Sequence, residues 1–157
     1  MKKLNLGCGT RPLPWHVNVD IVPMTGVNVV HDLDVFPWPF SDGEAAEISG
    51  YDIFEHIDDP IGFMTECARI LTPPRDGEPG GLLNLRTCFW QAENAFTDPT
   101  HKRFCTRRTF EYWVEGTEFN LSYGPAYARN GILFAYIDGY PRLEGTELAV
   151  KMRRITP

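Results

Sequence analysis

The feature that most restricts the fold of this chain is a glycine-containing turn near its start. A predicted strand, Lys3 to Leu6, runs directly into Gly7-Cys8-Gly9, and a second predicted strand, Val17 to Val22, contains Asp20. Glycines let a backbone approach a ligand closely, and a carboxylate in the second strand can accept hydrogen bonds from both hydroxyls of a ribose. This order predicts an α/β sheet with a nucleoside site. A tight turn that leaves a buried strand is the structural alternative.

The remaining sequence continues the alternation of strands and helices that is typical of a mostly parallel sheet. Asp59-Pro60 predicts a helix start, with Asp59 as the N-cap, and the helix must end before Pro73. No repeat or interdomain linker interrupts the chain, so we expect one domain over residues 1–157. Further strands are expected at 27–31, 46–51 and 82–88, and an antiparallel hairpin from 132–137 and 146–155 is expected to close one sheet edge.

A nicotinamide cofactor fits this turn poorly. The nicotinamide fingerprint needs a third glycine and a crossover helix, whereas this chain has Pro12 where that glycine would be. The segment from Thr10 to His16 also carries Pro14 and cannot form a normal helix. No helix N-terminus is then available for a pyrophosphate, so a ligand without phosphate fits better.

Several further segments, taken in order, make the pattern specific. Together with Leu4-Asn5-Leu6-Gly7-Cys8-Gly9, they resemble class I S-adenosylmethionine-dependent methyltransferases of the type 11 group, over residues 3 to about 88. The resemblance implies a Rossmann-like methyltransferase sheet with S-adenosyl-L-methionine as cofactor. The chain departs from that family in its reduced first crossover helix and in a longer loop at 72–81. The other matching segments are Trp15-His16-Val17-Asn18-Val19-Asp20-Ile21, His31-Asp32-Leu33, Phe36-Pro37-Trp38-Pro39-Phe40, Asp42-Gly43 and Phe54-Glu55-His56.

The resemblance also implies a set of cofactor-binding residues. The glycine turn would line the methionine part, Asp20 would hold the ribose diol, and Asp32 would meet the adenine amino group. Arg11 is a candidate partner for the cofactor carboxylate, although a surface arginine beside a proline loop is an equal alternative. The full set is Gly7, Cys8, Gly9, Arg11, Asp20, Ile21, Asp32, Leu33, Tyr51, Asp52 and Phe54.

Methyl transfer from a sulfonium is an in-line displacement, and a base near the methyl group assists a hydroxyl or amine acceptor. The candidates for this role are His101, His56 and Asp52. The alternatives are a packing role for His56, and for His101 a turn that caps a helix beginning near Thr106. We expect no metal site, because the spacing of these residues and Asp98 does not resemble a metal-binding motif.

The composition limits the classes of partner and the cellular location that we expect for this chain. The net charge of −6 disfavours nucleic acid, because phosphate binding needs clustered cations, and the run from Lys102 to Arg108 is more typical of a solvated face. The longest apolar stretch, Ile132 to Ile137, is too short to cross a bilayer. Four cysteines without a C-x-x-C pair are expected to be reduced, buried thiols. These observations predict a cytoplasmic protein.

We therefore expect an enzyme that methylates an acceptor, with a small molecule preferred. The long segment from Phe89 to Asn130 is expected to be irregular and to act as a lid or binding loop, with Trp90 and Phe96 as guesses for the acceptor pocket. The alternative is a non-catalytic module of the same fold that binds the cofactor or a partner. The sequence leaves the acceptor and the oligomeric state open.

Overall fold

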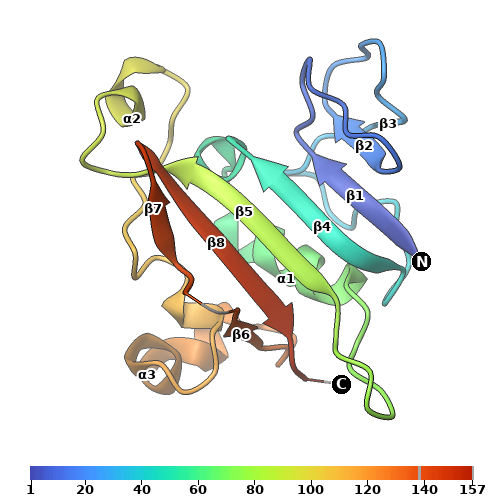
Figure 1. Cartoon of the computed structure of the whole chain (residues 1–157), viewed down its shortest axis with the longest axis vertical. Helices are drawn as coiled ribbons and strands as arrows, with labels where there is room; N and C mark the ends of the chain where they lie inside the picture. The colour runs from blue at the N-terminus through green and yellow to red at the C-terminus, as the bar shows by residue number, and fades with distance from the viewer. Residues whose placement is uncertain (138, 157) are drawn as a thin grey trace.

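The computed structural model describes residues 1–137 and 139–156, and its centre is one mixed sheet in the order β3-β2-β1-β4-β5-β8-β6, with β7 also paired to β8 (Figure 1). Strands β1 to β5 are parallel neighbours, and β8 runs antiparallel to β5, β6 and β7. The expected sheet with an antiparallel C-terminal end is confirmed. The strands are β1 (Lys2–Leu6), β2 (Val17–Asp20), β3 (Val29–Val30), β4 (Ala45–Tyr51), β5 (Leu82–Cys88), β6 (Phe134–Tyr136), β7 (Arg142–Glu144) and β8 (Glu147–Arg154).

The C-terminal hairpin is more elaborate than expected. The predicted pairing of 132–137 with 146–155 is confirmed as β6 against β8. The additional strand β7 pairs with the other half of β8 through a turn at Gly145, whose φ is +66°. The expected hairpin turn comprises residues 138–141, of which Asp138 lies outside the described residues.

One helix covers the apolar face of the sheet. Helix α1 spans Pro60–Ile70 and begins as predicted, because the Asp59 carboxylate accepts hydrogen bonds from the backbone N–H groups of Ile61 and Gly62 at 3.1 and 2.9 Å. Its last turn is closed by the buried Arg154 guanidinium, which donates to the carbonyls of Ala68 and Leu71. Strand β8 and helix α1 are thereby joined directly.

The two faces of the sheet differ in chemistry. Leu4, Ile48 and Val150 are fully buried in the core beneath α1, whereas Asn5 and Lys151 alternate with them along the same strands. Figure 1 shows α1 on one face only, with no comparable helix over the other. Parallel sheets are usually apolar on both faces, so a polar second face explains how this sheet tolerates a missing helical layer.

The connection between β1 and β2 contains no helix, as the two prolines predicted. Two buried asparagines hold it instead: Asn5 Nδ2 donates to Asn18 Oδ1 at 2.8 Å and to the Arg11 carbonyl at 3.3 Å. Asn18 Oδ1 also accepts from the Leu13 N–H at 2.8 Å, and Asn18 Nδ2 donates to the Leu13 carbonyl. Side-chain amides thus satisfy loop groups that a crossover helix would have satisfied internally.

The segment after β5 is less irregular than expected. It contains α2 (Asn94–Thr97), a 3₁₀ turn (Glu111–Trp113) and α3 (Glu118–Tyr127), and α3 lies near the β6 end of the sheet (Figure 1). No helix begins at Thr106 in the described chain; a hydrogen-bonded turn from Thr106 to Thr109 precedes the 3₁₀ turn. The alternative role of His101 as a cap for such a helix is therefore wrong. Within the described ranges, no helix has the length and apolarity that a membrane span requires.

The hydrogen-bonded pair Asn5 and Asn18, which we call the asparagine clamp, should contribute measurably to stability. Replacing Asn18 by Ala removes one of the two partners of Asn5 Nδ2 and both side-chain partners of the Leu13 backbone, so the free energy of unfolding should fall by about 1–3 kcal/mol. Urea denaturation followed by circular dichroism measures this change. Asn130→Ala, which removes two exposed side-chain hydrogen bonds, one to the Thr65 carbonyl and one from the Ile132 N–H, is the control. Equal effects of the two substitutions would show that the clamp does not hold the loop.

Candidate functional site

Two hollows flank the glycine turn at the carboxyl edge of the parallel strands. We call them the Arg11 hollow, of about 210 Å³, and the Asp32 hollow, of about 290 Å³. The Arg11 hollow is lined by Asn5, Gly7, Cys8, Gly9, Thr10, Arg11, Tyr51 and Asp52. The Asp32 hollow is lined by Asp20, Ile21, His31, Asp32, Leu33, Asp34, Ile53, His56, Ile57, Asp58 and Lys102.

The two glycines of the turn serve different purposes. Both have positive φ, +61° at Gly7 and +50° at Gly9, which favours glycine. A Cβ at Gly7 would lie 2.7 Å from the Ile53 side chain, so this glycine is required by packing. A Cβ at Gly9 would meet no atom within 4 Å, so the backbone there borders open space. Gly9 is therefore the position at which a ligand can approach the main chain.

Asp20 connects the end of β2 to this turn. Its Oδ2 accepts a hydrogen bond from the Gly9 N–H at 2.8 Å, and its Oδ1 accepts from the Val22 N–H at 3.0 Å. An ionised carboxylate has about four acceptor positions, so each oxygen retains capacity for another donor. Because Asp20 also lines the Asp32 hollow, it stands between the glycine turn and that hollow.

The loop after β3 supplies the far wall of the Asp32 hollow. Asp32 Oδ1 accepts from the Asp34 N–H at 3.0 Å, and the Asp34 carboxylate accepts from the N–H groups of Asp58 and Asp59 before α1. Leu33 is buried, and its carbonyl accepts from the Trp38 indole. The loop is thus held to the start of α1.

The predicted cofactor residues at the end of β4 divide into two groups. Arg11 Nη1 lies 3.9 Å from Asp52 Oδ2, and both residues line the Arg11 hollow with Tyr51. The Phe54 ring is 1% exposed and packs among core aromatic rings, so it lines neither hollow. The structure therefore does not place the Phe54 side chain where it could contact a cofactor in either hollow. Ile21, by contrast, is 60% exposed at the Asp32 hollow.

A pair of carboxyl groups lies beside the Arg11 hollow and was not foreseen. Burial, and then the neighbouring Asp52 carboxylate, raise the pKa of Glu147. Asp52 Oδ1 and Glu147 Oε2 are buried and have no hydrogen-bond partner within the described chain. A proton held between the two carboxyls would give these oxygens a partner. Asn94 Nδ2 donates to Glu147 Oε1, and Arg86 Nη2 lies 3.2 Å from Asp52 Oδ2.

Asp52 also has an unusual backbone. Its φ is +55°, in the left-handed region that costs energy for a residue with a side chain, and such conformations concentrate at functional sites. Glu147 begins β8 and is the register partner of Cys88, the last residue of β5. No local sequence pattern marks Glu147, because only the antiparallel pairing brings it to this edge.

A buried glutamate brings the two predicted histidines together. Glu55 is 1% exposed, and its carboxylate accepts from the Thr87 hydroxyl and the Cys88 N–H at 2.9 and 3.1 Å. The Glu55 carbonyl accepts from the Lys102 N–H at 2.8 Å, so the segment after α2 is docked on the 3₁₀ turn Phe54–His56. As a result, the ring centroids of His56 and His101 are 4.8 Å apart.

The three catalytic candidates therefore occupy two places at one edge. His56 lines the Asp32 hollow, with His101 beside it, and Asp52 lines the Arg11 hollow with Glu147 beside it. The thiol between these groups is not a nucleophile, because burial and then the charges of Glu147 and Glu55 raise the pKa of Cys88 to about 12.

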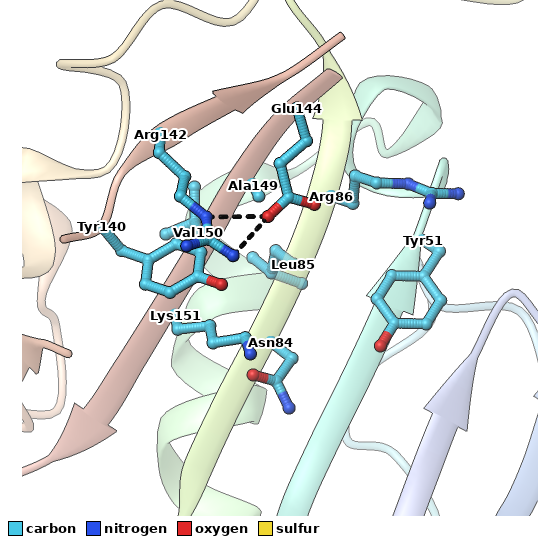
Figure 2. A pocket seen from close by; sticks show the side chains of 10 residues that line it. All are labelled: Tyr51, Asn84, Leu85, Arg86, Tyr140, Arg142, Glu144, Ala149, Val150 and Lys151. Carbon is cyan, nitrogen blue, oxygen red and sulfur yellow. Dashed lines mark hydrogen bonds and ion pairs between the residues drawn. The ribbon is translucent and has the colours of Figure 1, made fainter. Parts of the chain in front are cut away.

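A third hollow, of about 300 Å³, opens on the sheet face opposite α1 and shares Tyr51 with the Arg11 hollow. Figure 2 shows Tyr51 beside Arg86 across β4 and β5, and Tyr140 with Arg142 on the β7 side. Arg86 lies 5.2 Å from the Tyr51 ring, and Arg142 and Lys151 lie 4.4 and 5.2 Å from the Tyr140 ring. Arg142 is also paired with Glu144, so part of its charge is balanced.

The two aromatic residues guessed for the acceptor pocket lie elsewhere. Trp90 is 44% exposed and Phe96 is 63% exposed, and neither lines any of the three hollows. Phe96 stacks on Phe104, with ring centroids 4.4 Å apart. That guess is therefore not supported by the structure.

No known protein family's profile and no curated protein matches this sequence. Solved structures do match it. The carbon methyltransferase CurJ is 12% identical, over 100% of this chain and 49% of its own, with a TM-score of 0.58. A complex of the Haloferax volcanii Trm112 methyltransferase activator with a candidate methyltransferase gives 14% identity, coverage of 98% and 82%, and a TM-score of 0.58.

A third structure, an S-adenosylmethionine-dependent methyltransferase from Aquifex aeolicus, is 14% identical over 99% of this chain and 82% of its own, with a TM-score of 0.56. Identities this low carry information on the fold and not on the reaction. The chain has the fold of the class I S-adenosylmethionine-dependent methyltransferases, with a loop in place of the first crossover helix.

Proposed function

We propose that this protein binds S-adenosyl-L-methionine and transfers its methyl group to an acceptor, with a small molecule preferred. The observation that carries the proposal is the contact between Asp20 and the Gly9 N–H, which places an acceptor-rich carboxylate beside a side-chain-free turn. Open α/β sheets bind ligands at the carboxyl ends of their strands, which is where this contact lies.

The size of the hollows supports one extended ligand rather than two small ones. Ligand pockets usually measure about 300–1,000 Å³, and neither the Arg11 hollow nor the Asp32 hollow exceeds the lower limit. A nucleoside bound by Asp20 and Asp32 would extend past Gly9 into the Arg11 hollow. Arg11 would then meet the carboxylate at the amino-acid end. When bound, the cofactor supplies a methyl group on a positively charged sulfur.

The acceptor side is assigned to the edge that carries Asp52, His56 and His101. These residues come from the end of β4, the following 3₁₀ turn and the loop after α2. Their part is to orient the acceptor and to remove its proton as the new bond forms, either directly or through a bound group. Alignment of the two reactants contributes much of the rate in such displacements.

Two other functions are distinguished by one binding experiment. A nicotinamide-dependent reductase is disfavoured, because the structure has no helix after the glycine turn to receive a pyrophosphate. A non-catalytic module of the same fold would bind the cofactor without turnover. Calorimetry should show binding of S-adenosylmethionine and not of NAD, and methyl transfer to any acceptor in a radiolabel screen would exclude the non-catalytic module.

The ribose assignment is tested at Asp20. Asp20→Asn keeps the shape of the side chain but replaces one acceptor oxygen with a donor, so affinity for S-adenosylhomocysteine should fall by about 1.5–3 kcal/mol, or roughly 10–150-fold. Calorimetry measures the affinity, and thermal unfolding checks that the variant is folded. Asp76→Asn, in the distant loop between α1 and β5, should bind normally. Unchanged affinity in Asp20→Asn would remove the ribose assignment.

His101 should affect turnover more than cofactor binding. Once an acceptor is found, His101→Ala should lower kcat by about 10²–10⁴-fold, because the acceptor loses a proton-handling group. The dissociation constant of S-adenosylhomocysteine should change little. His16→Ala, at a half-buried loop position that lines neither hollow, is the matched control. The reverse pattern, with lost affinity and normal kcat, would make His101 a cofactor residue.

The carboxyl pair predicts a pH-dependent stability. The pKa of Glu147 is raised in the folded protein, so its neutral form adds stability at low pH, and this stability is lost as the pH rises through the folded-state pKa. Glu147→Gln mimics the neutral form. Its melting temperature should exceed that of the wild type by more at about pH 8 than at about pH 5, by about 2–4 °C for each kcal/mol. Glu144→Gln, an exposed control, should show no such trend; a parallel trend in both variants would contradict the pair.

A further inference from the structure

Three potential metal ligands meet beside the Asp32 hollow although they are distant in sequence. His56 closes the 3₁₀ turn after β4, and Asp98 and His101 belong to the loop after α2. One donor atom from each of the three side chains lies within 4.8 Å of those of the other two. The spacing 56, 98, 101 resembles no metal-binding motif, so only the folded chain shows this arrangement.

Hydrogen bonds fix the tautomer that each imidazole ring has in its neutral form. His101 Nδ1 lies 2.9 Å from the Ala95 carbonyl, which can only accept, so Nδ1 carries a proton and, in the neutral ring, Nε2 has the lone pair. The Thr100 hydroxyl donates its one proton to Asp98 Oδ1 at 2.7 Å, so it accepts from His56 Nδ1 at 2.9 Å. In its neutral ring, His56 Nε2 then also has a lone pair. A second ring nitrogen anchored on oxygen is characteristic of metal-binding histidines.

Hydrogen bonds also hold one oxygen of the Asp98 carboxylate and leave the other free. Asp98 Oδ1 accepts from both the hydroxyl and the N–H of Thr100, at 2.7 and 2.8 Å, which leaves Oδ2 available. The nearest cation along the loop, Lys102, is paired with Asp58 at 2.7 Å. Two imidazole rings and one carboxylate therefore face one another, with the neighbouring ammonium held elsewhere.

We propose that His56, Asp98 and His101 bind a divalent first-row transition-metal ion of the Zn²⁺ type. Two nitrogens and one carboxylate oxygen suit Zn²⁺, Co²⁺, Ni²⁺ or Fe²⁺, whereas Mg²⁺ and Ca²⁺ prefer oxygen ligands alone. The two rings are half-buried and Asp98 is exposed, so coordination positions remain open toward solvent. Three protein ligands with an open position are typical of sites that act on a bound molecule.

A second ligand set containing His101 fits a metal less well. Glu55 and Cys88 also lie within 4.8 Å of it, but they are buried. Both Glu55 oxygens already accept hydrogen bonds, from Thr87 and from the Cys88 N–H. A metal there would have to displace these contacts, whereas His56 Nε2, His101 Nε2 and Asp98 Oδ2 have no hydrogen-bond partner within the described chain.

Metal binding itself does not depend on methyl transfer, but its role toward an acceptor rests on the proposed function. A bound cation lowers the pKa of a coordinated hydroxyl and holds it in place. The two imidazoles would then act on the acceptor through the cation, because their lone pairs are engaged. The experiment is therefore done without S-adenosylmethionine, so that its result is independent of turnover.

The test is a Co²⁺ titration of the untagged, chelator-treated full-length protein, followed by visible absorption and calorimetry. The wild type should bind one equivalent, and Zn²⁺ should displace it. His56→Ala, His101→Ala and Asp98→Asn should each weaken binding at least about tenfold. Asp98→Asn retains Oδ1 for the Thr100 contacts, and circular dichroism verifies that each variant is folded. His16→Ala and His31→Ala, at the two remaining histidines, should bind as the wild type does.

Three outcomes would overturn the proposal. The first is no saturable uptake of Co²⁺ by the wild type. The second is an equal loss of binding in the two control variants, which would indicate non-specific association. The third is a strong thiolate-to-cobalt absorption band that disappears in Cys88→Ser, because this would place the ion in the buried set with Glu55.

Discussion

The site depends first on the hydrogen-bonded pair Asn5 and Asn18. A crossover helix normally fixes the turn after the first strand, and the prolines of this chain exclude one. The two buried amides replace it, because together they hold the backbone of Arg11 and Leu13 against β1 and β2. Gly9 is then held where its N–H can reach Asp20. The nucleoside end of the proposed cofactor site therefore rests on a polar contact between strands.

The same asparagines belong to the polar face of the sheet. A helical layer needs an apolar surface beneath it, and the alternation of Leu4, Asn5 and Leu6 provides such a surface on one side only. The missing layer is therefore encoded in the strands themselves. It leaves a hollow with Arg86 and Lys151 on the uncovered face, next to Tyr51 at the proposed cofactor site (Figure 2).

Local patterns predicted much of the fold, since the strands, the start of α1 and the loop around Pro12 follow from alternation, capping and backbone chemistry. The glycine turn and Asp20 were predicted together for the same reason. Strand β7 and the position of Glu147 were missed, because each depends on pairing with a distant part of the sheet. Phe54 was assigned from its position after β4, but a single residue's position does not show that its ring turns into the core.

The carboxyl edge also shows how charge is arranged around the proposed reaction. Burial and the Asp52 charge raise the pKa of Glu147, which favours the neutral form of that carboxyl, and Arg86 lies 3.2 Å from Asp52. The methyl donor loses its positive charge as the methyl group leaves, so a strongly negative wall would stabilise the reactant more than the transition state. The raised pKa of Glu147 and the contact of Arg86 with Asp52 both reduce the negative charge of this wall. In the proposed reaction, His56 and His101 are then the candidate bases of this edge.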